Sequence, residues 1–200
     1  MKMLNRKPGG PAGFARRYLD RLSDLLKSID TEEVGRVAGV LAEARRRGRR
    51  IFLIGNGGSA ATASHMANDL GIGCKEHAGR RFQTISLTDN VPVMTAIAND
   101  SGYDEVFVGQ LEYLLSPRDV VVAISASGNS PNVVRAVRYA ARKKAVTVGF
   151  VGFDGGALRR LCDHVVWVKT PKGEYGPVED IHMVLDHLLM SYLKSSSRSD

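Results

Sequence analysis

The chain has little cysteine and no long apolar run, and both absences narrow its class. Cys74 and Cys162 are the only two cysteines among 200 residues, and they stand far apart in no Cys-x-x-Cys arrangement. They encode neither a disulfide framework nor a thiolate zinc site, so we expect inert packing residues. No apolar stretch approaches the roughly 18 residues needed to cross a bilayer, and residues 1–10 lack the apolar segment of a signal peptide. We therefore expect a soluble, cytoplasmic protein without a membrane partner.

Signatures of nucleotide binding are also missing. Residues 55–60 read Gly-Asn-Gly-Gly-Ser-Ala, without the third glycine of Gly-x-Gly-x-x-Gly. The Gly-Lys-Ser/Thr of a P-loop does not occur anywhere in the sequence. NAD and ATP are therefore both disfavoured as ligands.

The charge is basic, with a net value of +7 and its densest run, Arg-Arg-Arg-Gly-Arg-Arg, at residues 45–50. Such a run raises nucleic acid as a partner, but no aromatic residue interleaves with it and no base-reading motif is visible. We interpret the run as the last turn of a helix, where cations complement the helix dipole and Gly48 can take the left-handed cap. Nucleic acid is thus disfavoured, whereas an anionic metabolite fits the same charge.

Helical and strand patterns alternate along most of the chain. Amphipathic helices are expected at 13–29 and from Asp30, which forms a capping-box-like start with Glu33, to Gly48. Apolar strands are expected at 51–54, 82–87, 120–125, 146–151 and 164–168, and further helices at 59–70, 91–98, 103–114, from Pro131, at 156–161 and at 177–194. This order predicts an α/β fold, a doubly wound parallel sheet sandwiched by helices with an N-terminal helical pair. We expect a single domain over 13–194, with disordered tails at 1–12 and 195–200.

Two of the strands end in Gly/Ser/Asn turns that open a helix, at residues 55–59 and 125–130. In an open parallel sheet, ligands bind beyond the carboxyl ends of the strands, where the strand order switches. Glycines let the backbone approach a ligand closely, unpaired N–H groups at the helix start point outward, and serine hydroxyls add donors. A phosphate is the ligand that suits this arrangement. One such turn can be a tight connection and nothing more; the repetition indicates an anion site.

Titratable side chains gather on two of the expected helices. His65 and Asp69 are four residues apart and share one face, either as an acid/base or metal-ligand pair or as a surface ion pair. The last helix carries five such residues: Glu179, Asp180, His182, Asp186 and His187. At about 100° per residue, Glu179, His182 and Asp186 lie within about 60° of each other, whereas His187 lies about 80° from Glu179. One metal ion would therefore more easily take the first three.

Two further features concern the sugar and the assembly of the protein. Asn99 and Asp100 follow a short apolar helix, where a turn or cap is the ordinary role and a contact to a sugar hydroxyl is the functional one. The helices at both chain ends have no obvious sheet surface to cover, which predicts an oligomer whose subunits meet through helices.

These motifs resemble those of the sugar isomerase (SIS) domain family, and most closely its phosphoheptose isomerase branch. The resemblance covers about residues 15–193. It rests on Gly55-Asn56-Gly57-Gly58-Ser59 with His65, on Ala98-Asn99-Asp100, on residues 124–130, and on Glu179-Asp180-Ile181-His182 with His187. It implies a SIS-type, flavodoxin-like fold and a homotetrameric aldose–ketose isomerase that converts sedoheptulose 7-phosphate to a heptose 7-phosphate.

The resemblance also implies which residues form the site. Substrate contacts would fall on Asn56, Gly57, Gly58, Ser59, Asn99, Asp100, Ser125, Ser127, Ser130 and Glu179. The branch uses a histidine and a glutamate on the first-turn helix, and a glutamine and a histidine on the last helix, as zinc ligands or acid/base groups. Those positions here hold His65, Asp69, Glu179 and His187. Zinc is the implied cofactor, and Asp69 and His187 are the implied catalytic pair.

Several positions depart from the family's pattern. Asp69 is one methylene shorter than the family's glutamate, and Glu179 brings a charge where the family has a neutral amide. That charge should strengthen a metal site but repel a phosphate or an enediolate. Ala126 replaces a hydroxyl residue between the two serines, and Gly73 stands where an arginine is common, with Lys75 as a substitute. The sequence therefore leaves two alternatives, a zinc enzyme and one that uses these groups as acid and base alone.

The resulting hypothesis places the phosphate on the second turn and the sugar towards the first. Asp69 or His187 would remove the proton alpha to the carbonyl and the other would assist at the neighbouring oxygen, giving an enediol(ate), while a metal held with His65 and Glu179 polarises the carbonyl. If the last helix belonged to a neighbouring subunit, the site would exist only in the oligomer. The alternative is a non-catalytic phosphosugar-binding regulator, or a protein like the DnaA initiator-associating relatives, on the same fold. His187 favours the enzyme, because those relatives usually lack that histidine.

Overall fold

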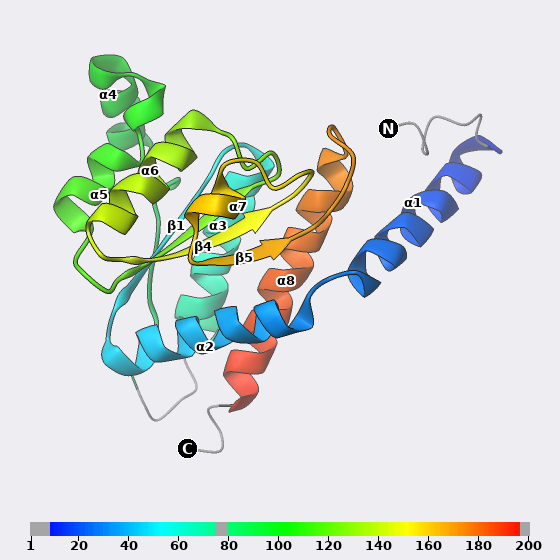
Figure 1. Cartoon of the computed structure of the whole chain (residues 1–200), viewed down its shortest axis with the longest axis horizontal. Helices are drawn as coiled ribbons and strands as arrows, with labels where there is room; N and C mark the ends of the chain where they lie inside the picture. The colour runs from blue at the N-terminus through cyan, green and yellow to red at the C-terminus, as the bar shows by residue number, and fades with distance from the viewer. Residues whose placement is uncertain (1–8, 75–79, 197–200) are drawn as a thin grey trace.

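A parallel sheet of five strands forms the centre of the molecule (Figure 1). The structure is a computed structural model that describes residues 9–74 and 80–196. The strands are β1 Arg50–Gly55, β2 Gln83–Ser86, β3 Val120–Ser125, β4 Val146–Val151 and β5 His164–Trp167. Their order is β2-β1-β3-β4-β5, and every neighbouring pair is parallel. This confirms the predicted fold class, and the order of the strands switches direction between β1 and β3.

Helices connect these strands and cover both faces of the sheet. The α-helices are α1 Gly10–Lys27, α2 Thr31–Arg47, α3 Gly58–Asn68, α4 Val91–Ser101, α5 Val108–Leu114, α6 Pro131–Arg142, α7 Leu158–Leu161 and α8 Tyr175–Ser196. A π-helical turn, η1 Asp69–Gly73, continues α3, and a 3-10 turn, η2 Tyr103–Glu105, follows α4. Within the described ranges, none of the helices combines the length and the apolar character that crossing a membrane requires.

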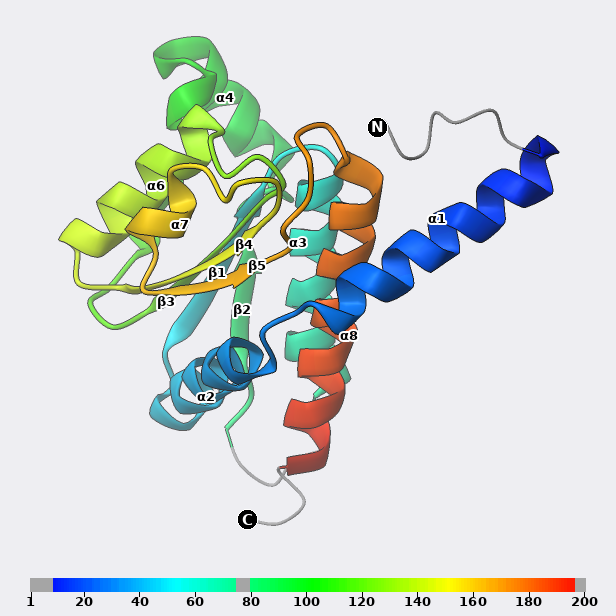
Figure 2. The same cartoon turned by 45° about the vertical axis from the view of Figure 1, so that its right-hand side comes forward.

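Side chains that alternate along each strand build two separate cores. In β1, Ile51 and Leu53 join one buried cluster, while Phe52 and Ile54 join the other. The first cluster is filled by α2, α3 and α8, and the second by α5, α6 and α7. Figures 1 and 2 show α3 and α8 side by side on one face of the sheet, with α6 and α7 on the other. The central strand β3 and most of β1 are apolar because both of their faces are buried, whereas the edge strand β2 carries Gln83, Thr84 and Ser86 and is only partly buried.

The first helix, α1, extends away from the sheet and contacts the rest of the chain mainly through α8 (Figure 2). Arg21 on α1 forms an ion pair of 2.9 Å with the buried carboxylate of Glu174. Tyr18 donates a hydrogen bond to Asp180, which lies on the first turns of α8. These polar contacts fix the carboxyl half of α1 against the start of α8.

Several expected boundaries were wrong. Helix α1 begins at Gly10 and α8 ends at Ser196, so residues 10–12 and 195–196 are helical and not disordered tails. The expected helix 103–114 divides into η2 and α5, and the expected helix 59–70 changes to π-helical hydrogen bonding at Asp69. Asn99 and Asp100 lie inside the last turn of α4 and not after it. Residues 1–8, Lys75 and residues 197–200 lie outside the described residues.

Candidate active site

Both polar turns lie at the carboxyl edge of the sheet, at the switch between β1 and β3. The first follows β1 and opens α3, with Gly57 at the N-cap in a positive φ of 54° that glycine adopts without strain. The second follows β3 and opens α6, whose first residue is Pro131 as the sequence predicts. Two helix N-termini therefore face the same edge, which makes it suited to an anion.

A reciprocal amide pair joins the two turns. The side chains of Asn56 and Asn132 each donate to the other, both at 2.9 Å. The hydroxyl of Tyr103 donates to the same oxygen of Asn56 at 3.0 Å. Asn132 is buried in the first turn of α6, so the first turn is tied directly to the helix that the second turn opens. The two turns are thus one structural unit.

Three serine hydroxyls converge in the second turn. The buried Ser125 Oγ lies 3.5 Å from both Ser127 Oγ and Ser130 Oγ, and it accepts the backbone N–H of Gly128 at 3.2 Å. Ser130 is the N-cap residue of α6, yet its hydroxyl does not cap that helix. The convergence concentrates hydroxyl donors at a helix N-terminus, the arrangement that suits a phosphate.

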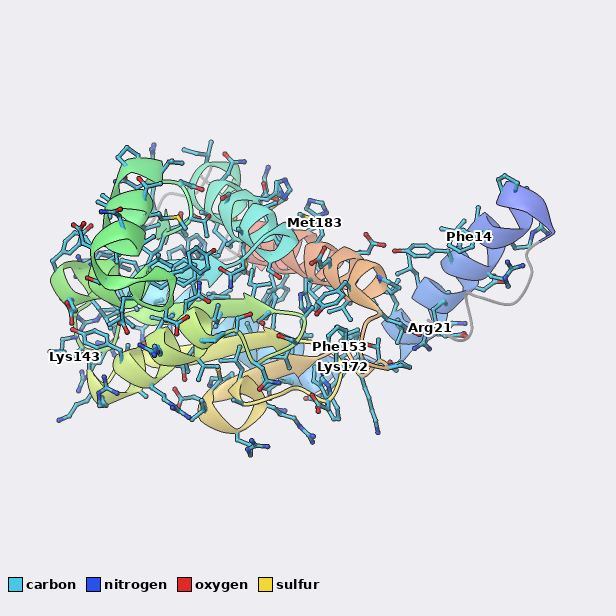
Figure 3. The ribbon with its side chains drawn as sticks, turned by 90° about the horizontal axis from the view of Figure 1, so that it is seen from above. Phe14, Arg21, Lys143, Phe153, Lys172 and Met183 are labelled. Carbon is cyan, nitrogen blue, oxygen red and sulfur yellow. The ribbon has the colours of Figure 1, made fainter. Side chains whose placement is uncertain are left out.

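A cavity of about 620 Å³ adjoins the second turn at Ser127. Its charged lining consists of three cations, Arg159, Lys169 and Lys172, and one carboxylate, Asp154. The buried hydroxyl of Thr170, which also lines it, has no hydrogen-bond partner among the described residues. Figure 3 shows Phe153 and Lys172 next to each other in this region, near the start of α8. Positive charge therefore stands beside the serine hydroxyls.

Four side chains of α3, η1 and α8 form a separate polar group, which consists of His65, Asp69, Asp186 and His187. One potential ligand atom from each lies within 4.8 Å of all the others. His65 Nε2 lies 3.9 Å from one oxygen of Asp69, and His187 Nε2 lies 4.0 Å from the other. The two imidazole rings meet edge to face, with centroids 5.0 Å apart. A set of imidazole nitrogens and carboxylate oxygens is a donor set that zinc accepts.

Burial shifts the pKa of several groups on α8. Burial, and then the nearby Asp69 carboxylate, raise the pKa of Asp186 to about 7. Burial, followed by the neighbouring Asp180, raises the pKa of Glu179. Burial lowers the pKa of His182 to about 4, so this imidazole is neutral near pH 7. His182 is fully buried, packs against Phe150, and neither ring nitrogen has a described partner of good hydrogen-bond geometry.

The structure unites only part of the expected site. The helical angles grouped Glu179, His182 and Asp186, but the structure does not bring these three together as ligands. His182 is buried in the core and Glu179 lies against the first turn. A Cβ atom at Gly58 would collide with the Glu179 carboxylate. Glu179 is likewise outside the metal-capable group, in which Asp186 takes its place. All four members of that group come from one chain.

The remaining expected residues lie around this arrangement. Asn56, Gly57, Gly58 and Ser59 form the first turn, and Ser125, Ser127 and Ser130 form the second. Asn99 and Asp100 are exposed on α4, where the Asn99 amide donates to Asp100 at 2.9 Å. Sequence reasoning missed Asn132 and Tyr103. For Asn132 the available signal was its position directly after Pro131, in the first turn of a helix that the sequence predicts to face an anion.

Comparisons with known proteins bear on this arrangement. A model of the SIS domain family matches residues 17–152. The chain is 42% identical over 153 residues to a phosphoheptose isomerase of Pelobacter propionicus, covering 75% of this chain and 80% of the relative. It is 35% identical over 180 residues to that of Aliarcobacter butzleri, covering 89% and 94%. The solved phosphoheptose isomerase GmhA of Neisseria gonorrhoeae superposes with a TM-score of 0.77 at 30% identity, over 92% of this chain and 96% of that one.

Proposed function

The chain belongs to the SIS domain family, and we propose that it isomerises sedoheptulose 7-phosphate to a heptose 7-phosphate through an enediol. That it is a sugar-phosphate isomerase follows from relatives named phosphoheptose isomerase at 35% and 42% identity, each covering at least three quarters of the chain. The observation that best supports the proposal is the Asn56–Asn132 pair, which joins a phosphate-binding turn to the turn that opens the helix of His65.

In this proposal the phosphate of the substrate binds to the second turn. Ser125, Ser127 and Ser130 supply hydroxyl donors, and the N-terminus of α6 supplies backbone N–H groups. The cations of the adjoining cavity offset the charge of the phosphate. The sugar extends over the first turn, where its hydroxyls meet Asn56, Gly57, Gly58, Ser59 and Glu179, with Asn99 and Asp100 as further contacts.

Asp69 and His187 carry the proton transfers in this proposal. One of them removes the proton from C1 of the ketose, the carbon next to the carbonyl, and the other protonates the carbonyl oxygen at C2, which gives the enediol. The proton then returns to C2 while the hydroxyl of C1 loses its own, and an aldehyde forms. The separation of 4.0 Å between Asp69 Oδ2 and His187 Nε2 is suited to a pair that acts on neighbouring atoms.

Zinc is the proposed cofactor. His65 Nε2 and the nearer oxygen of Asp69 would hold it, which leaves the other Asp69 oxygen and His187 Nε2 free for the proton transfers. The ion would supply a Lewis acid that polarises the carbonyl and stabilises negative charge on its oxygen. Glu179 is proposed as a substrate contact and not as a ligand, because its carboxylate lies against Gly58.

The test is proton NMR of the purified chain with sedoheptulose 7-phosphate in D₂O, with added zinc and with a chelator. We expect aldose signals and deuterium incorporation in the wild type, and neither in Asp69→Ala or His187→Ala. Asp24→Ala, an exposed carboxylate on α1, is the matched control and should keep full activity. Binding without exchange in any condition would contradict the proposed substrate and favour a phosphosugar-binding regulator.

A further inference from the structure

Asp186 is a carboxylate in an unusual place. It lies on α8 with no exposed surface, next to the buried Leu185 and three residues before the buried Leu189. Its Oδ2 lies 3.2 Å from Nδ1 of His65, whereas its Oδ1 is buried without a partner among the described residues. A carboxylate that is buried and only half satisfied costs stability, so packing alone does not explain the residue.

The contact decides how the imidazole of His65 is used. When Nδ1 carries the proton and donates it to Asp186, Nε2 keeps its lone pair. That Nε2 faces Asp69 and lies in the group that also contains His187. The only other described contact of Nδ1 is Met183 Sδ at 3.1 Å, a weak acceptor that lies where α3 and α8 meet (Figure 3). The ionised carboxylate of Asp186 can only accept, so it is the group able to fix the Nδ1–H tautomer.

We infer that Asp186 is a positioning residue, which holds His65 in the Nδ1–H tautomer so that Nε2 is presented to a divalent cation. Carboxylates behind metal-bound histidines act in this way by orienting the ring and raising its basicity. The inference rests on the metal site of the proposed function. It adds a residue that contacts the ligand histidine from behind and need not touch the metal or the substrate.

The experiment compares Asp186→Leu and Asp186→Asn with wild type, using full-length, metal-stripped protein. Zinc affinity is measured by competition with a chromophoric chelator, and the tautomer of His65 by ¹⁵N NMR, with its signals assigned by their loss in His65→Gln. For Asp186→Leu we expect zinc affinity to fall roughly 10- to 100-fold and the Nε2–H tautomer to appear. The thermal midpoint should stay or rise, because a buried polar oxygen is replaced by an apolar side chain.

Asp186→Asn is the conservative variant. The amide oxygen can still accept from Nδ1–H but carries no charge, so the tautomer should persist and the loss of affinity should be smaller. It also keeps the inference testable should Asp186→Leu fail to fold. Asp180→Asn on the same helix, whose partner is Tyr18 on α1, is the matched control and should leave both readouts unchanged.

Three outcomes would overturn the inference. The first is an unchanged zinc affinity in Asp186→Leu. The second is a lost affinity with an unchanged His65 tautomer, because that would make Asp186 a direct ligand. The third is an absence of zinc binding in the wild type. Failure of the proposed reaction is separate, since zinc affinity and tautomer are measured without sugar. A wild type that binds zinc through Asp186-oriented His65 but does not isomerise sedoheptulose 7-phosphate would support the inference and contradict the substrate.

Discussion

Asp69 illustrates how one residue and its local backbone act together. It begins the π-helical turn that continues α3, and its two carboxylate oxygens lie 3.9 and 4.0 Å from His65 and His187. Single π-turns are frequent at functional sites. If the π-turn places the short Asp69 side chain, the glutamate that the family resemblance implies at this position should not fit here. A longer side chain would move the carboxylate by about 1.5 Å, the length of one C–C bond.

We therefore predict that Asp69→Glu lowers kcat, although it restores the residue of the family pattern. A displacement of about 1 Å at a reacting group can cost roughly 100-fold. The NMR exchange assay measures the rate, and zinc affinity measured in parallel separates a misplaced base from a lost ligand. Asp69→Asn keeps the length and removes the charge, so it should be inactive as well. A fully active Asp69→Glu would mean that the π-turn does not position this carboxylate.

His182 makes a pH-dependent contribution to stability. Burial lowers its pKa from 6.5 to about 4, so between these values the unfolded chain takes up a proton that the folded chain excludes. The free energy of unfolding therefore falls as the pH drops from 6.5 towards 4. We predict that His182→Leu removes this loss. On going from about pH 7.5 to about pH 5.5, the free energy of unfolding of the wild type should fall by about 1 kcal/mol more than that of His182→Leu. Urea unfolding at both pH values measures it, and parallel behaviour of the two proteins would contradict it.

The residues of the candidate site were only partly predictable from sequence. His65, Asp69 and His187 could be proposed from spacing and resemblance, and the structure brings them together. On α8, the resemblance pointed to Glu179 and His187, and the helical angles grouped Glu179 with His182 and Asp186; only Asp186 and His187 lie with His65 and Asp69. The angle around one helix does not reveal which helix packs against it. The contact of α3 with α8 brings Asp186 to His65 and leaves His182 against Phe150. Asn132 was missed for the same reason, since its partner Asn56 is 76 residues away.

At the scale of elements, the start of α2 depends on one side chain. Asp30 Oδ1 accepts the backbone N–H groups of Glu32 and Glu33 at 3.0 and 3.1 Å. The reciprocal half of the capping box is missing, because Glu33 instead accepts from Val165 of β5 and pairs with Arg36. We predict that Asp30→Ala lowers the free energy of unfolding by about 1 kcal/mol, and Asp30→Ser by less. Chemical denaturation measures both, and equal losses would argue against a capping role.

The second turn depends on Gly128. Its φ is 63°, and a Cβ atom there would collide with the carbonyl of Gly155. We predict that Gly128→Ala shifts the loop, weakens phosphosugar binding and costs roughly 1–3 kcal/mol of stability. Gly173→Ala is the matched control, because its φ is also positive, at 97°, but nothing lies within 4 Å of its Cβ position. Gly173→Ala should lower the stability by less than Gly128→Ala and leave phosphosugar binding unchanged. Equal effects of the two substitutions would assign the loss to backbone strain alone.

Element boundaries followed the sequence where packing and propensity agree. The expected strands 120–125 and 146–151 match β3 and β4 residue for residue, because runs rich in valine and other apolar residues are followed there by Gly- or Ser-containing turns. The end of α4 was misjudged, since Asn99 and Asp100 are polar but tolerated in a last helical turn. The helix ends instead at Ser101, and its C-cap residue Gly102 has a φ of 96°. Short polar stretches thus indicate a boundary only when a glycine or proline fixes it.

At the scale of the whole molecule, α1 and α8 present apolar side chains to solvent. Leu19 on α1 is 64% exposed and Tyr192 on α8 is 55% exposed. Leu188 and Val184 lie four and eight residues before Tyr192 on the same helical face and are also exposed. Such surfaces mark protein interfaces, so we predict a homo-oligomer, and propose a tetramer. Sedimentation equilibrium should give a multiple of the chain mass, and Leu19→Lys with Tyr192→Lys should lower it. A wild-type monomer would contradict the prediction.

Zinc binding should not depend on assembly into an oligomer. The sequence had raised the opposite case, in which the site exists only in the oligomer. His65, Asp69, Asp186 and His187 are all contributed by α3, η1 and α8 of one chain, and these elements pack against each other within that chain. We predict that the Leu19→Lys and Tyr192→Lys variant keeps wild-type zinc affinity when its mass has fallen to that of one chain. Both substitutions lie outside the group, so a loss of affinity would have to come from the lost neighbour. If the zinc affinity is lost when the assembly dissociates, a neighbouring subunit completes or rigidifies the metal site. If the zinc affinity persists but isomerisation is lost, the neighbouring subunit contributes to the sugar site and not to the metal site.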